Sequence, residues 1–217
     1  MVQIVKVNPE NPEQEVLLQA AELLRQGGLI GYPTETVYGL GANPFRPDAV
    51  ERLNRLKKRP GNRSVILLIE GERMLRELVE DVPAPALLLL ERFWPGPLTI
   101  VFKANQLLPA HLQPTVALRV SSHPVAQGIV RKLKMPLVSS SANLSGAPPA
   151  RSAQQVQESF PQGLNLIIDG GPAGEPEVST IVDVTTEKVA ILREGKIGLE
   201  EVREVVGRQI RQKVFYL

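Results

Sequence analysis

Cysteine is missing from this sequence and aromatic residues are scarce, which excludes several classes of protein. No Cys occurs among the 217 residues, so disulfides, thiolate metal sites and cysteine nucleophiles are excluded, and a reducing compartment is favoured. Five Phe, three Tyr and one Trp offer no stacking platform for nucleic-acid bases. Histidine occurs only as His111 and His123, and nearby prolines put both in loops or at helix starts, so catalysis by histidine is not expected.

Long hydrophobic runs and a strong charge of one sign are also missing. The longest apolar run, residues 84–90, contains a proline and is far too short to span a bilayer, and residues 1–10 lack the composition of a signal peptide. The formal net charge is only +2. We therefore expect a cytoplasmic protein without membrane contact. With 43% hydrophobic residues, we expect one domain over residues 1–200 and a helical tail, residues 201–217, that is not a separate domain.

The apolar residues that are present alternate between strand and helix patterns. Short continuous apolar runs are typical of buried strands, and apolar residues three and four apart are typical of helices. Predicted strands cover residues 2–7, 29–32, 65–69, 98–102, 116–120, 166–169, 180–184 and 188–192. Predicted helices cover residues 47–58, 72–80, 85–93, 124–134, 153–159 and 199–217, and another begins with Asn11 as its N-cap. This mixture predicts an α/β protein with a twisted, mixed, open sheet flanked by helices, whose strand order is left open.

Common catalytic motifs are absent, and hydroxyl groups near predicted strand ends are what the sequence offers instead. It contains no P-loop, no GxGxxG, no HExxH and no GxSxG. Residues 32–41, YPTETVYGLG, follow a short apolar stretch and are interpreted as a binding loop, because glycine lets a ligand approach the backbone closely. Residues 139–143, SSSAN, follow another apolar stretch and could bind an anion or an amide.

Cations gather around the end of the predicted helix 47–58. Lys57 and Arg59 stand at that end and Arg63 follows, so several cations could converge on phosphate oxygens. A solvated helix face is the alternative explanation for such a charge run. Arg119 alternates with apolar neighbours on a predicted strand and therefore points away from the core face. Polar groups at strand ends are typical of ligand sites in open α/β sheets.

Taken in order along the chain, these segments resemble the YrdC-like domain family, the catalytic domain of threonylcarbamoyl-AMP synthases, in its single-domain form. The resemblance covers residues 13 to about 200. It rests on seven collinear motifs: 32–41 (YPTETVYGLG), 57–60 (KKRP), 94–99 (WPGPLT), 117–120 (ALRV), 141–146 (SANLSG), 179–183 (STIVD) and 192–195 (LREG). One such motif is weak evidence, whereas seven in the same order are specific.

The resemblance implies an enzyme, a nucleotidyltransferase that makes threonylcarbamoyl-adenylate and pyrophosphate from L-threonine, bicarbonate or CO2, and ATP. The product would serve threonylcarbamoyladenosine modification of tRNA. The implied fold has a positively charged concave face that binds ligands. Mg2+ would accompany ATP and neutralise the leaving pyrophosphate, without a dedicated metal site in the protein. The implied partners are the three substrates, the downstream proteins that transfer the threonylcarbamoyl group to tRNA, and RNA as a potential contact.

The same resemblance assigns roles to residues that match the family's motifs. The implied L-threonine site comprises Thr36, Arg119, Ser139 and Ser179, with Arg119 as the partner of the carboxylate. The implied ATP site comprises Lys57, Arg59, Arg63, Thr115, Ser141, Asn143 and Arg193, of which Lys57 and Arg59 are the catalytic pair beside the phosphates. Such chemistry needs positioning and charge stabilisation but no protein nucleophile. The sequence departs from the family's pattern at 61–64, 149–152 and Val178, so ATP-side contacts around 61–68 and 147–152 are left open.

Two other functions are weighed against the synthase. A non-catalytic module that binds double-stranded RNA or the ribosome would use the same fold and a positive concave face. Such a module would have no need of Thr36, Arg119 and Ser179 together. Carbamoyl transfer in hydrogenase maturation would require Cys-rich accessory segments, which a sequence without Cys excludes.

Overall fold

Strands and helices alternate along most of the chain. The structure is a computed structural model that describes residues 2–58, 65–106, 108–174, 177–207 and 210–212. Its strands are β1 (Gln3–Lys6), β2 (Ile30–Tyr32), β3 (Gly39–Ala42), β4 (Ile66–Leu68), β5 (Leu98–Lys103), β6 (Thr115–Arg119), β7 (Leu137–Ser141), β8 (Leu166–Asp169), β9 (Thr180–Asp183), β10 (Val189–Arg193) and β11 (Ile210–Gln212). Its helices are α1 (Gln14–Arg25), α2 (Pro47–Leu56), α3 (Glu72–Leu78), α4 (Ala84–Phe93), α5 (Pro124–Leu133), α6 (Ala153–Ser159) and α7 (Leu199–Val206), with a short 3-10 helix η1 (Ala110–Leu112).

All of these strands belong to one sheet. Their order is β1-β8-β2-β3-β7-β4-β6-β5-β9-β10-β11. The pairs β1/β8, β2/β8, β4/β6, β5/β9 and β10/β11 are parallel, and the other neighbours are antiparallel. The predicted mixed, open sheet flanked by helices is therefore confirmed, and the structure adds the strand order that the sequence left open.

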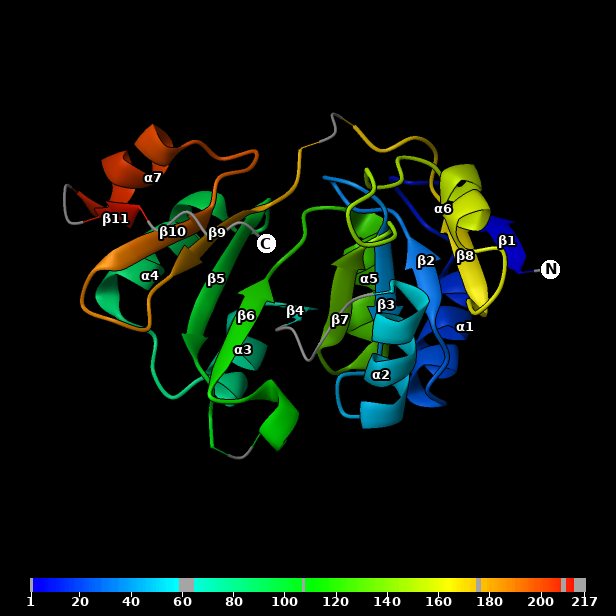
Figure 1. Ribbon diagram of the computed structural model, residues 1–217, viewed down its shortest axis with the longest axis horizontal. Helices are drawn as coiled ribbons and strands as arrows, with labels where there is room; N and C mark the ends of the chain where they lie inside the picture. The colour runs from blue at the N-terminus through cyan, green and yellow to red at the C-terminus, as the bar shows by residue number, and fades with distance from the viewer. Residues whose placement is uncertain (1, 59–64, 107, 175–176, 208–209, 213–217) are drawn as a thin grey trace.

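The sheet and its helices form two halves that meet at β4 (Figure 1). One half contains β1, β8, β2, β3 and β7 together with α1, α2, α5 and α6. The other contains β6, β5, β9, β10 and β11 together with α3, α4 and α7. Within the halves, α1 packs against α5 and α4 packs against α7. Strand β4 therefore joins the halves through β7 on one side and β6 on the other.

Apolar periodicity explains how these elements pack. In α1, Leu17, Ala20 and Leu24 recur on one stripe and are buried. In β4, Leu67 and Leu68 point to opposite faces and both are buried, as the continuous apolar run 65–69 predicts. The buried apolar residues of both halves form one cluster. Within the described ranges, no helix has the length and apolar character needed to cross a membrane.

The first helix begins later than predicted. Helix α1 starts at Gln14 with Glu13 as its N-cap, so the expectation that Asn11 caps it is wrong. The reason lies in a turn made by Asn8, whose Oδ1 accepts hydrogen bonds from the backbone N–H groups of Glu10 and Asn11 at 3.0 and 3.2 Å. This local side-chain bonding competes with helix formation and delays the helix start.

The segment 32–41 is not a single loop. Gly39–Ala42 forms β3, which pairs antiparallel with both β2 and β7. Two of its four residues are glycine, which has a low preference for strands, so the sequence pattern did not indicate a strand here. Only the residues between Tyr32 and Gly39 form the predicted loop.

The predicted helix over residues 199–217 ends early. Gly207 follows α7 with a φ of 76°, a positive value that glycine adopts readily and that is incompatible with continuing the helix. Ile210–Gln212 then pairs in parallel with β10, so the expectation of a wholly helical tail is wrong. Helix α2 likewise ends at Leu56, before the predicted end at Lys58. Lys58 itself has a φ of 51°, which is incompatible with a continuing α-helix.

Candidate active site

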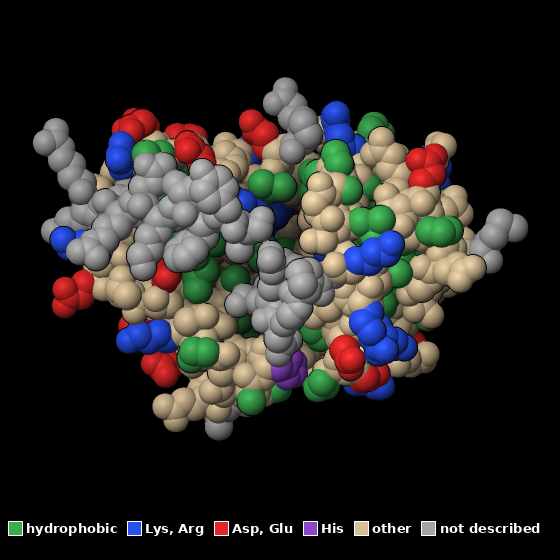
Figure 2. All heavy atoms as spheres, in the orientation of Figure 1, with side chains coloured by type: hydrophobic (Ala, Val, Ile, Leu, Met, Phe, Trp, Pro, Cys, Tyr) green, Lys and Arg blue, Asp and Glu red, His purple; other side chains and the backbone are tan. Residues whose placement is uncertain are grey.

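Alternate residues of neighbouring strands line a cavity of about 560 Å³ on one face of the sheet. Ala117 and Arg119 of β6 line it, as do Ser139 and Ser141 of β7. Successive side chains of a strand point to opposite faces, so this spacing of two puts all four on the same face. Ile66 of β4 pairs with both Ala117 and Ser139 and completes the floor between them. The surface is hollowed between the two halves, with Lys or Arg atoms visible inside the hollow (Figure 2).

The wall of this cavity carries many hydroxyl groups and few charges. Its Ser and Thr residues are Thr34, Thr36, Thr115, Ser139, Ser140, Ser141 and Ser179. Among the residues that the structure describes, the charged side chains of the lining are Arg119, Arg193 and Asp183. Such a wall suits a small ligand with an anionic group and several hydrogen-bonding atoms.

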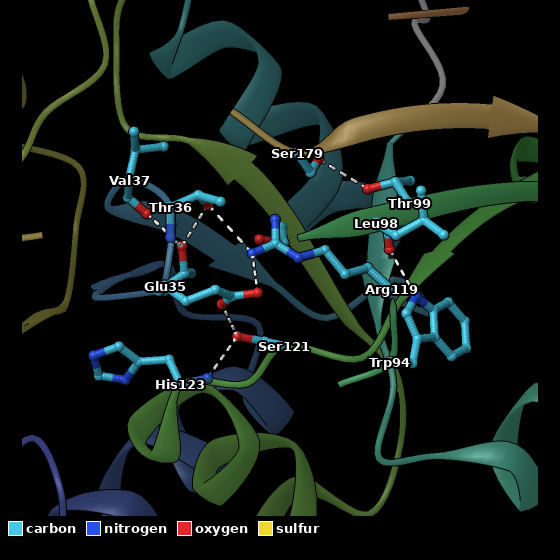
Figure 3. A network of polar contacts seen from close by, with 12 residues as sticks. Glu35, Thr36, Val37, Trp94, Leu98, Thr99, Arg119, Ser121, His123 and Ser179 are labelled. Atoms are coloured by element: carbon cyan, nitrogen blue, oxygen red, sulfur yellow. Dashed lines mark hydrogen bonds and ion pairs between the residues drawn. The ribbon is translucent and has the colours of Figure 1, made fainter. Parts of the chain in front are cut away.

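A buried ion pair holds Arg119 at the end of β6 (Figure 3). Its Nη2 lies 2.6 Å from Glu35 Oε1 and donates a hydrogen bond to Thr36 Oγ1 at 3.2 Å. The Thr34 and Thr36 hydroxyl oxygens lie 2.9 Å apart. Arg119 Nε is buried without a hydrogen-bond partner among the described residues, and the other terminal nitrogen points away from Glu35 in Figure 3. The guanidinium therefore keeps N–H groups for a ligand.

Glu35 carries a negative charge that offsets the charge of Arg119. Ser121 Oγ donates a hydrogen bond to Glu35 Oε2 and accepts one from the backbone N–H of His123 at 3.2 Å. Burial works against ionisation of Glu35, but the Arg119 guanidinium and the Ser121 hydrogen bond outweigh it, so the pKa of this carboxyl lies below its ordinary value. Burial also lowers the pKa of His123, which leaves this imidazole neutral at pH 7.

Ser179 is fixed at the start of β9 by two neighbouring strands. Thr99 of β5 places its Oγ1 2.9 Å from Ser179 Oγ. Arg193 of β10 donates from Nη2 to Ser179 Oγ at 3.0 Å, and from Nε and Nη2 to the Ser179 carbonyl oxygen at 3.0 and 2.8 Å. The Ser179 hydroxyl group therefore has a defined position in the cavity wall.

Lys57 is buried and does not lie on a solvated helix face. The residue is only 4% exposed, and its Nζ donates to the carbonyl oxygens of Ser141 and Asn143, the second at 2.9 Å. Ser141 Oγ donates in turn to Asn143 Oδ1 at 2.5 Å. Lys57 thus ties the end of α2 to the segment that follows β7, at the edge of the cavity. For Lys57 itself, the alternative of a solvated charge run is wrong.

The structure brings most of the predicted site residues together. Those that line the cavity are Thr36, Thr115, Arg119, Ser139, Ser141, Ser179 and Arg193. Lys57 and Asn143 contact Ser141 beside it. Arg59 and Arg63 lie outside the residues that the structure describes.

Sequence reasoning missed four residues that hold this site together. Tyr32 and Glu35 lie inside the motif 32–41, Thr99 ends the motif 94–99, and Ser121 follows the motif 117–120 directly. Their place in or beside a motif was the available signal. Their contacts join strands that are distant in the sequence, so their roles needed the tertiary structure.

A larger groove of about 1400 Å³ lies between helices α1, α3, α4 and α5. None of the predicted site residues lines it, although Ser121 forms part of its wall. Its charged side chains are Arg and Lys residues of α1 and of α5 and its C-terminal end, and Glu residues before α1 and near α3 and α4, without a convergent set of hydroxyl groups. The smaller cavity, where hydroxyl groups and arginines converge, is therefore the candidate active site.

Comparisons with known proteins place most of the chain in one family. The profile of the Sua5/YciO/YrdC family, described as "Telomere recombination", matches residues 22–195. A relative from Pyrococcus abyssi named threonylcarbamoyl-AMP synthase is 37% identical over 210 residues, which cover 95% of this chain and 62% of the relative. A relative of the same name from Cellvibrio japonicus is 40% identical over 173 residues, which cover 78% of this chain and 92% of the relative.

A solved structure agrees with the sequence matches. The structure of P. abyssi Sua5 complexed with L-threonine has a TM-score of 0.91 and 38% identity, and the match covers 97% of this chain and 62% of that chain. This chain thus spans about three fifths of the length of the P. abyssi relative. Because the family profile covers most of the chain and the fold agrees throughout, the chain belongs to the Sua5/YciO/YrdC family.

Proposed function

We propose that this protein is a threonylcarbamoyl-AMP synthase, an enzyme of the nucleotidyltransferase type. One observation carries the proposal: Arg119 is held by Glu35 and Thr36, yet keeps N–H groups in a cavity lined by hydroxyls. The Arg119–Glu35 pair is neutral as a whole, so a zwitterionic amino acid can enter without burying a net charge. The names of the relatives and the L-threonine bound to P. abyssi Sua5 support this choice of substrate.

L-threonine would occupy the part of the cavity around Arg119. Its carboxylate would accept charge-assisted hydrogen bonds from the guanidinium N–H groups that Glu35 does not use. Thr36, Ser139 and Ser179 would supply the remaining hydrogen bonds from three separate strands or loops. A rigid frame of this kind holds the amine in place for reaction with bicarbonate or CO2, which converts it to a carbamate.

ATP would occupy the side of the cavity bounded by β7 and β10. The proposed contacts are Lys57, Arg59, Arg63, Thr115, Ser141, Asn143 and Arg193, with Lys57 and Arg59 beside the phosphates. A carbamate oxygen would attack the α-phosphorus and form the new P–O bond. The bond from the α-phosphorus to the bridging oxygen would break, and pyrophosphate would leave with its electron pair. The cations would stabilise the charge that develops on the phosphate oxygens, and in this proposal they form the positively charged concave face.

Mg2+ would be the counterion of ATP. Asp183 is the carboxylate that lines the cavity, and in the described ranges no group of three or more His, Cys, Asp or Glu side chains could hold a metal ion. This donor set fits an ion held mainly by phosphate oxygens and water. When bound, Mg2+ would neutralise charge on the pyrophosphate leaving group.

The proposed product defines the proposed partners. A mixed anhydride of a carbamate and AMP is reactive, so proteins that transfer its threonylcarbamoyl group to tRNA must consume it, and we place the enzyme in the cytoplasm with them. RNA contact remains the main alternative use of the same concave face. The hydroxyl-lined cavity favours the synthase, because RNA binding alone does not need Thr36 and Ser179 around a buried Arg119.

The proposal is tested by incubating the protein with ATP, Mg2+, L-threonine and carbon-14 bicarbonate. Pyrophosphate and a labelled adenylate are expected only when all substrates are present. Thr36→Val removes the hydroxyl that accepts from Arg119 but keeps the shape, and it should raise the KM for L-threonine at least about tenfold. Arg203→Gln, on the exposed face of α7, should change nothing. Tight binding of RNA without any adenylate would overturn the proposal in favour of the RNA-binding module.

A further inference from the structure

The ring of Tyr32 crosses one strand to reach the wall of the cavity. Tyr32 ends β2 and Ser139 lies on β7, and β3 stands between these two strands. The Tyr32 hydroxyl group nevertheless donates a hydrogen bond to Ser139 Oγ at 2.7 Å. Tyr32 is fully buried and does not line the cavity, whereas Ser139 does. Tyr32 therefore reaches the cavity indirectly, and its hydroxyl group acts there through Ser139.

Two glycines in β3 make room for this ring. Tyr32 pairs with Gly39, and Gly41 pairs with Ser139, so all four residues share one face of the sheet. A Cβ atom on Gly39 would lie 3.1 Å from Tyr32 Cζ and 3.4 Å from Ser139 Oγ. A Cβ atom on Gly41 would lie 3.1 Å from Tyr32 Cε1. Both distances to the ring are shorter than a comfortable carbon–carbon contact, so any other residue would push the ring away from β3.

The burial of Tyr32 decides which group donates in this hydrogen bond. Burial raises the pKa of the Tyr32 phenol, so the group keeps its proton at all ordinary pH values. A buried O–H group needs an acceptor, and among the described residues the acceptor is Ser139 Oγ. If Ser139 donated instead, the phenol proton would be buried without a partner. Ser139 thus accepts from Tyr32 and keeps its own proton for the cavity.

We infer that Tyr32 is a positioning residue that makes the Ser139 hydroxyl group a hydrogen-bond donor toward the ligand. The site therefore selects a ligand with an acceptor oxygen next to Ser139. This inference rests on the proposed function, in which that oxygen belongs to L-threonine. It also explains the alternating glycines of β3. They make room for the Tyr32 ring to reach from β2 to β7, where its hydroxyl group sets the direction of the Ser139 hydrogen bond.

A double-mutant cycle tests the inference. Tyr32→Phe removes the phenolic oxygen and keeps the ring, so the Ser139 hydroxyl group becomes free to rotate. The Kd for L-threonine, measured by isothermal titration calorimetry, should rise about three- to tenfold, while the KM for ATP should stay within about twofold. Ser139→Ala should weaken L-threonine binding at least as much. In the Ser139→Ala background, Tyr32→Phe should have no further effect, because its action passes through the missing hydroxyl.

Thr180→Val is the matched control. Thr180 is also fully buried and does not line the cavity, and its hydroxyl group donates to the Ile197 carbonyl oxygen at 2.6 Å, so the variant likewise loses a buried hydrogen bond. It should leave the Kd for L-threonine unchanged. An unchanged Kd in Tyr32→Phe, or an equal effect of Tyr32→Phe with and without Ser139, would overturn the inference. Binding to the unmodified protein is measured first: if L-threonine does not bind there, the proposed function fails, whereas if it binds, a failed cycle overturns only the role of Tyr32.

Discussion

Replacing Glu35 by alanine should destabilise the protein far more than replacing an exposed glutamate. The Glu35 and Arg119 side chains are 14% and 7% exposed, and 2.6 Å separates their charged atoms. Glu35→Ala removes the carboxylate and leaves the Arg119 guanidinium buried without its counterion. Breaking a buried pair in this way typically costs about 3 to 5 kcal/mol, because the remaining charge cannot regain its hydration.

The free-energy loss in Glu35→Ala corresponds to a measurable fall in Tm. Each kcal/mol lowers Tm by roughly 2 to 3 °C in a protein of about 200 residues, so Glu35→Ala should lower Tm by about 6 to 15 °C. Glu72→Ala is the matched control, because Glu72 pairs with Arg76 at 2.5 Å but both side chains are about 60% exposed. Exposed pairs contribute little, and its Tm should fall by no more than about 3 °C.

Thermal denaturation followed by circular dichroism measures both variants. A third variant, Glu35→Ala with Arg119→Met, removes both charges and should recover most of the lost stability, because an apolar side chain then replaces the stranded cation. Two results would refute the reasoning. One is an equal loss of Tm in Glu35→Ala and Glu72→Ala. The other is a double variant no more stable than Glu35→Ala, which would mean that lost contacts and not the buried charge cause the effect.

Three further predictions concern pH, the glycine strand and the lysine at the cavity edge. Because folding lowers the pKa of Glu35, its contribution to stability is complete above about pH 4.5 and is lost as the pH falls through the folded-state pKa. The Tm difference between the unmodified protein and Glu35→Gln should therefore shrink below about pH 4.5. A Tm difference that stays constant down to about pH 3 would contradict this prediction. Gly41→Ala crowds the Tyr32 ring and should lower the free energy of unfolding in urea by about 1 to 3 kcal/mol, whereas Gly174→Ala, where a Cβ atom meets nothing within 4 Å, should not. Lys57→Met leaves the carbonyl oxygens of Ser141 and Asn143 without the hydrogen bonds that Lys57 donates. It should raise the KM for ATP at least about tenfold in the coupled pyrophosphate assay and change the Kd for L-threonine by no more than about twofold. Equal effects on both substrates would indicate general unfolding of the site instead.

Much of the fold could be predicted because local patterns and tertiary packing agree. The strand at 65–69 and the helix at 153–159 lie where apolar runs and spacing indicate. The errors fall where a short-range contact or an unusual residue overrides the pattern. The Asn8 turn shifts the start of α1, and Gly207 ends α7. The two glycines of β3 gave this segment a pattern that is not typical of a strand. These deviations depend on individual hydrogen bonds or on a single φ angle, which periodicity does not report.

Some residues of the candidate site could also be predicted from the sequence, whereas others could not. Arg119, Ser139 and Ser179 were identified from their motifs, and the structure places all three in one cavity. Glu35 and Tyr32 belong to the first of those motifs, but no pattern in the sequence distinguishes a residue that lines a cavity from one that supports the lining from behind. That distinction depends on partners on β6 and β7, more than 80 residues away in the sequence.

The sequence by itself determined most of the helices and strands, the family and the chemical character of the site. Spacing of apolar residues, glycine and proline positions, and ordered motifs are local properties, so they can be read along the chain. Only the tertiary structure decided the strand order, the burial of Lys57 and the pairing of Arg119 with Glu35. It also decided the path of Tyr32 across β3 to Ser139. These are contacts between strands that pair across long stretches of sequence, and their energies depend on burial, which exists only once the chain has folded.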